Sequence, residues 1–105
     1  MHDNFETEPA VLKAKITGET ARIHWHELQK FYAAGAVIEV VAGLDLVEVA
    51  YAFAIDDKAL VGGWLQAGQV QRVEDARASH WHQHSAELWA VVVSPWVLVQ
   101  DKHIH

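Results

Sequence analysis

The sequence predicts an α+β fold in a single compact, winged-helix-like domain with an extra helical segment at the N-terminus. The 105 residues suit one domain, and a content of 51% hydrophobic and 21% charged residues is typical of globular proteins. Apolar residues recur at helical spacing in some segments, while others are rich in β-branched residues. The order is helix, strand, helix, helix, strand, insert and strand, with the insert in the place of the wing. We expect a core of about residues 10–100 and short flexible termini.

The first third of the chain predicts two helices and a strand. Thr7 is a candidate cap for a short helix with Pro9 in its first turn, and Thr17 is a candidate cap for a longer one. The longer helix is predicted from an apolar stripe that ends before Gly35 and consists of Ala21, Trp25, Leu28 and Tyr32. The run AVIEVV that follows is predicted to be a short, largely buried strand.

The middle of the chain has the clearest helix signals. Asp45 with Glu48 three positions later is a capping-box pattern, which predicts a helix start. Asp56 is the candidate cap of the next helix, which is expected to end at Gly68. Four apolar residues of this second helix are predicted to share a core face: Leu60, Val61, Trp64 and Leu65.

Two glycines, Gly62 and Gly63, lie inside this second helix. Each costs a helix about 1 kcal/mol relative to alanine. We therefore expect a tertiary reason for them, such as close packing against another backbone.

The last third predicts two extended segments around a short insert. QVQRV is predicted to be a brief strand, and EDARASHWHQHSA a short helix or a structured loop. ELWAVVVSPWVLVQ is predicted to be a long extended segment bent at Pro95.

Four stretches resemble a family of small bacterial proteins, the domain-of-unknown-function family 2288. They are GETARIHWHELQKFYAAGAVIEV, LDLVEVAYAFAIDD, WLQAGQV and, most specifically, ELWAVVVSPWVLVQ. The resemblance covers the chain from about residue 12 to residue 100. It implies no activity, substrate or catalytic residue, and the histidines do not belong to the family pattern.

Composition excludes several classes of function. The formal net charge is −6 and the Lys and Arg residues are scattered, which counts against nucleic acid as the main partner. The chain has no cysteine, so disulfides and thiolate chemistry are excluded. The longest apolar segment, residues 88–99, is interrupted and too short to span a membrane. The acidic N-terminus lacks a signal-peptide pattern, so we expect a cytoplasmic protein without membrane partners.

The sharpest chemical signal is the pair His80 and His84, which share one face of a helix and could chelate zinc or nickel. The residue after His80 is Trp81 rather than the glutamate of a zincin helix. A third ligand would have to come from His24, His26, Glu87 or His103. The alternative is a solvated helix face, with Trp81 buried and the three neighbouring histidines, His80, His82 and His84, at the surface. No bound cofactor is expected, because no glycine-rich phosphate-binding loop is present. No serine has the G-x-S-x-G context of an activated nucleophile.

Three functions follow from these observations. The leading hypothesis is a non-enzymatic cytoplasmic interaction module that binds a protein partner or a second copy of itself. It would use Trp96 and the final extended segment, because that segment is unusually apolar. The alternative is a His-based metal-binding protein, with or without hydrolytic activity. The third is a DNA-binding regulator, which the charge disfavours because the helix in the recognition position offers only Lys58 and Gln66 beside two aspartates.

Overall fold

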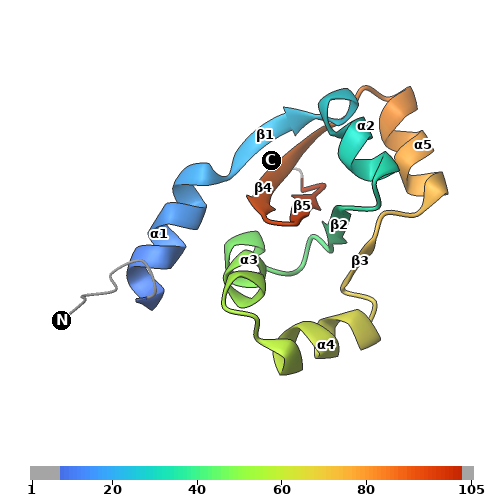
Figure 1. Ribbon diagram of the computed structural model, residues 1–105. Coiled ribbons are helices and arrows are strands. Elements are labelled where there is room, and N and C mark those ends of the chain that lie inside the picture. The colour runs from blue at the N-terminus through green and yellow to red at the C-terminus, as the bar shows by residue number, and fades with distance from the viewer. Residues whose placement is uncertain (1–7, 103–105) are drawn as a thin grey trace.

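A five-stranded mixed sheet lies between helices on both of its faces (Figure 1). The computed structural model describes residues 8–102. The elements in chain order are α1 (Pro9–Glu19), β1 (Ala21–His24), α2 (Trp25–Ala33), β2 (Val37–Val40), α3 (Leu46–Ala54), α4 (Lys58–Gln66), β3 (Val70–Arg72), α5 (Asp75–Gln83), β4 (Glu87–Val93) and β5 (Trp96–Gln100). The α+β prediction is confirmed, whereas the predicted Thr7 cap and the predicted flexible ends lie outside the described residues.

The last strand of the chain lies at the centre of the sheet. The strand order is β1-β4-β5-β2-β3, and the β2–β5 pair is parallel while the other pairs are antiparallel. The segment predicted to bend at Pro95 is therefore a hairpin, in which Val93 lies opposite Trp96. Residues 97–100 are buried because the helical layers cover both faces of β5.

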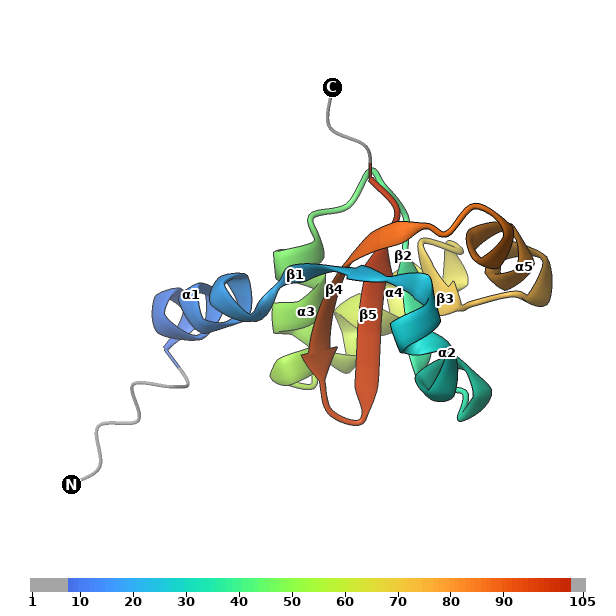
Figure 2. The ribbon, with the colours of Figure 1, turned by 90° about the horizontal axis from the view of Figure 1, so that it is seen from above.

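The core has two halves, one on each face of the sheet. Alternation along β5 sends Val97 and Val99 to the half that includes α2 and α5, and Leu98 to the half that includes α1 and α3. Figure 2 shows α2 on one side of the β4–β5 hairpin and α3 on the other. The β4–β5 hairpin therefore contributes buried residues to both half-cores.

Local helix signals were predicted with mixed success. The Asp45 cap is confirmed, because its carboxylate accepts from the backbone N–H groups of Val47 at 2.9 Å and Glu48 at 3.3 Å. The Asp56 cap is wrong. Asp57 caps α4 by accepting from the backbone N–H of Leu60 at 3.1 Å, while Asp56 has a φ of 57° in the turn before it.

The long helix predicted from Thr17 to Tyr32 is wrong in its first part, whereas its second part is present as α2, which ends before Gly35 as predicted. The Thr17 hydroxyl donates to the Lys13 carbonyl inside α1, and the chain leaves that helix at Thr20. Ala21–His24 then forms β1, which pairs with the first four residues of β4. Pairing with a strand far along the chain overrides the local helical spacing.

The winged-helix likeness is not confirmed. The insert assigned to the wing is a regular helix, α5, which buries Ala78 and Trp81 against the sheet. The brief strands predicted for AVIEVV and QVQRV are present as β2 and β3. Within residues 8–102, no helix is long and apolar enough to cross a membrane.

Candidate functional site

Helix α4 has no buried residue, although the sequence predicts a core face for it. Leu60 is 45% exposed and Leu65 is 52% exposed. The predicted core stripe is therefore wrong for these two leucines. Trp64 still packs against the core that contains α3. A different set of α4 residues, spaced i, i+3, i+4 and i+7, lines a cavity: Lys58, Val61, Gly62 and Leu65.

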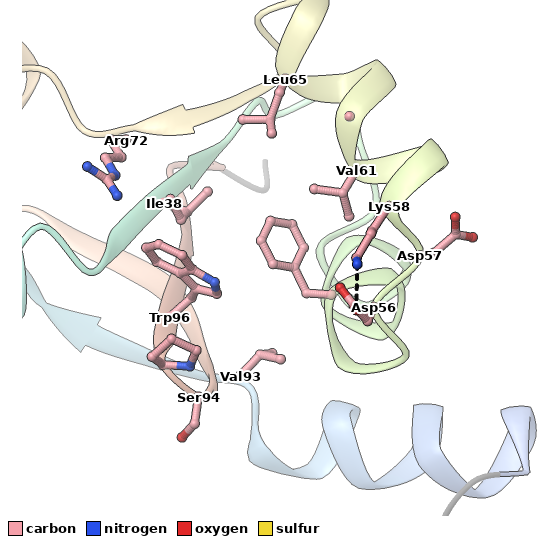
Figure 3. A pocket seen from close by; sticks show the side chains of 13 residues that line it. Ile38, Asp56, Asp57, Lys58, Val61, Leu65, Arg72, Val93, Ser94 and Trp96 are labelled. Atoms are coloured by element: carbon pink, nitrogen blue, oxygen red, sulfur yellow. Dashed lines mark ion pairs between the residues drawn. The ribbon is translucent and has the colours of Figure 1, made fainter.

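This cavity, called the docking groove below, lies between α4 and the turn that joins β4 to β5 (Figure 3). Its volume is about 650 Å³, which is within the range of ligand sites. Val61 and Leu65 point from α4 toward Ile38 and Trp96 on the sheet. Its apolar lining consists of Ile38, Phe53, Val61, Gly62, Leu65, Val93, Pro95 and Trp96.

Charges are placed at the ends of the docking groove. At one end the guanidinium of Arg72 lies 5.6 Å from the ring centre of Trp96. Across the described part of the chain, Arg72 forms no ion pair. At the other end, Lys58 lies 3.8 Å from the Asp56 carboxylate, and Asp57 is engaged in capping α4. The groove thus offers a cation beside an aromatic surface, and no carboxylate among residues 8–102 forms an ion pair with it.

Within residues 8–102, neither glycine of α4 is required by close packing. A Cβ built on Gly62 or on Gly63 meets no atom within 4 Å, so the expected close approach of another segment of this chain is wrong. Gly62 lines the docking groove, whereas Gly63 does not. Because Gly62 has no side chain, α4 leaves space in the docking groove at this position.

The histidine pair lies at the exposed end of α5. The ring centres of His80 and His84 are 4.2 Å apart, and the Nδ1 of His84 lies 2.8 Å from the His80 carbonyl oxygen. Trp81 is buried and its three histidine neighbours are exposed, as the sequence predicts. The residues that the structure describes contain no group of three side chains able to hold a metal. The metal site at His80 and His84 therefore stays a prediction.

Among the described residues, none of the expected third ligands joins His80 and His84 in a group able to hold a metal. The Nε2 of His24 is 3.6 Å from Glu87, and His26 stacks on His24. His103 is outside the described residues.

Comparisons with known proteins agree with the resemblance seen in the sequence. The family model described as "Protein of unknown function (DUF2288)" matches residues 11–101. The chain belongs to the DUF2288 family. It is 44% identical to the protein in the NMR solution structure of PA1075 from Pseudomonas aeruginosa, with a TM-score of 0.78. That match covers 99% of this chain and 95% of the other. No curated protein matches the sequence significantly.

The DUF2288 chain also contains a polar network that sequence reasoning missed. Arg77 of α5 donates to Glu39 at 3.0 Å and to Asp101 at 3.4 Å. The indole N–H of Trp81 donates to the same Asp101 carboxylate at 3.0 Å. A single glutamate within the otherwise apolar AVIEVV was the available signal, because a carboxylate in a buried strand requires a partner. The network holds α5 on the sheet.

A second contact between helices joins α2 to α5. The Tyr32 hydroxyl donates to the Asp75 carboxylate. This hydrogen bond is the main cause that raises the pKa of Tyr32 above its usual value, and burial and the carboxylate charge add to it. Neither Tyr32 nor Asp75 lines the docking groove, so we assign both to the stability of the DUF2288 fold.

Proposed function

We propose that this protein is a non-enzymatic, cytoplasmic interaction module that binds an apolar helical segment of a partner protein in the docking groove. The observation that supports the proposal is α4, a helix without a buried residue whose regular stripe lines a cavity. Contiguous exposed apolar surface on a soluble protein marks a contact site. Trp96, expected from the sequence to contact a partner, lies in this cavity.

A helix suits the apolar lining of the docking groove. A partner helix that lays its apolar face into a groove anchors it with residues spaced i, i+3 or i+4, and i+7. Gly62 lets the backbone of such a helix approach α4 closely. The lining supplies aliphatic and aromatic surface from both α4 and the hairpin, so the partner side chains would be enclosed from two sides.

The charges specify the polarity of the partner segment. The guanidinium of Arg72 lies beside the ring of Trp96 and favours a carboxylate at this end of the bound helix. At the other end the two carboxylates of Asp56 and Asp57 outnumber the single cation of Lys58, so this end favours a basic residue. The expected partner is thus an amphipathic helix with opposite charges at its two ends.

The proposal is tested by selecting peptides from a random library on the purified protein and measuring their affinity by fluorescence polarisation. Gly62→Leu fills the docking groove, and Gly63→Leu is the matched control on the adjacent, non-lining position. We expect the selected peptides to lose about tenfold in affinity with Gly62→Leu, equivalent to about 1.4 kcal/mol. Gly63→Leu should change the affinity less than about twofold, because it adds volume outside the groove.

The charge assignment has its own control. Arg72→Gln should weaken peptides that carry an acidic end, whereas Arg22→Gln should not. Arg22 lies at the same distance, 5.6 Å, from the ring centre of Trp89 and is outside the groove. Equal binding by all variants would overturn the proposal. A concentration-dependent dimer that Gly62→Leu dissociates would also overturn it, because the occupant would then be a second copy.

A further inference from the structure

The outer edge of β4 is only partly covered. β1 pairs with residues 87–90 of β4 and extends no further. Residues 91–93, called the edge segment below, pair with β5 on one side. On the other side, no strand within the described chain pairs with them. An uncovered strand edge presents backbone N–H and C=O groups that can pair with another chain.

A second, smaller apolar cleft lies beside this edge segment, on the α2 face of the sheet. Its volume is about 260 Å³. Val92 is 59% exposed, the largest exposed fraction among the large hydrophobic residues that the structure describes, and Phe31 is 36% exposed. Ile23 and Leu28 complete the apolar wall. The cleft can therefore receive an aliphatic side chain from a segment that pairs with the edge.

The rim of this cleft is acidic. Glu19, at the end of α1, and Glu27, in the first turn of α2, both line it. Within residues 8–102 neither glutamate forms an ion pair. Lys30 of α2 lies 5.1 Å from the ring centre of Phe31, but it does not line the cleft. The charge of the rim is complementary to a basic segment.

We infer that the edge segment binds an extended, basic segment of a partner protein by β-strand addition. Backbone pairing with residues 91–93 would supply affinity, the cleft would take an aliphatic residue, and the two glutamates would pair with Lys or Arg. A second copy is disfavoured, because a two-fold pairing of this edge would bring the same carboxylates together. The inference concerns a different face of the sheet from the docking groove and does not depend on it.

The test uses a short synthetic peptide in which valine alternates with lysine, N-methylated along one edge to prevent self-assembly. The control peptide alternates valine with glutamate. Binding to the ¹⁵N-labelled full chain is followed by amide chemical shifts and hydrogen exchange. We expect the lysine peptide to perturb the amides of residues 91–93 and to slow exchange at Val92, and we expect the glutamate peptide to do neither.

Three variants make the result decisive. Val92→Lys places a charge at the cleft and should abolish binding of the lysine peptide. Val41→Lys is the matched control, because Val41 is another exposed valine outside the cleft. The double variant Glu19→Gln with Glu27→Gln should weaken binding about twofold to tenfold, as expected for two exposed ion pairs. Equal binding of both peptides, shifts mapped to another surface, or a dimer that Val92→Lys dissociates would each overturn the inference.

Discussion

Replacing either glycine of α4 by alanine should stabilise the fold. Gly62 and Gly63 occupy the helix interior, neither has a left-handed φ, and a Cβ at either position meets no atom within 4 Å. Glycine in such a position costs about 1 kcal/mol relative to alanine, mainly because the unfolded chain loses more conformational freedom on folding. The structure contains no clash that would offset this gain.

The expected gain is about 0.5–1 kcal/mol in the free energy of unfolding for each alanine. For a domain of this size, that gain corresponds to a rise in Tm of about 2–8 °C. Urea denaturation followed by circular dichroism gives the free energy, and differential scanning calorimetry gives Tm. Both alanine variants should behave alike, because their surroundings in the free protein are equally open.

Two other glycines supply the opposite control. Gly35 and Gly68 end helices with φ values of +74° and +71°, a conformation that costs an alanine about 1–2 kcal/mol. Gly35→Ala and Gly68→Ala should therefore destabilise the protein. A loss of stability in Gly62→Ala or Gly63→Ala would refute the reasoning, since it would show that α4 needs these glycines for its own packing.

Three further outcomes are expected. Asp45→Ala should lower the free energy of unfolding by about 1 kcal/mol through loss of the α3 cap, while Asp56→Asn, which removes no cap and keeps a residue type that tolerates the left-handed φ of 57°, should change it by less than about 0.5 kcal/mol in urea denaturation. His80→Ala combined with His84→Ala, or a chelator, should leave Tm unchanged; a large drop in both would reveal a structural metal site. No sequence-dependent, submicromolar binding to duplex DNA should be measurable at physiological salt, and such binding in a titration would contradict the acidic charge balance.

Local rules in the sequence predicted some elements and missed others for identifiable reasons. The Asp45 cap and the burial of Trp81 were predictable because short-range spacing determines them. Strand β1 was not predictable in this way, because its partner in β4 lies far along the chain. The exposure of Leu65 was not predictable either, because helical periodicity shows that a face is apolar without showing what covers it. The candidate site was therefore anticipated only through Trp96.

The excess apolar character of the final segment has two separate causes. Most of it is explained by position, because β5 is central and its residues must be apolar toward both half-cores. Val92 is not explained in this way, since it is largely exposed, and Trp96 is explained only in part, since it packs against the half-core that contains α3 but stays partly exposed. They border opposite faces of one hairpin: Trp96 lines the docking groove, and Val92 lines the cleft beside α2. Apolar surface that the core does not cover is where a contact function is expected. The two surfaces can be separated experimentally, because Gly62→Leu alters only the first and Val92→Lys only the second.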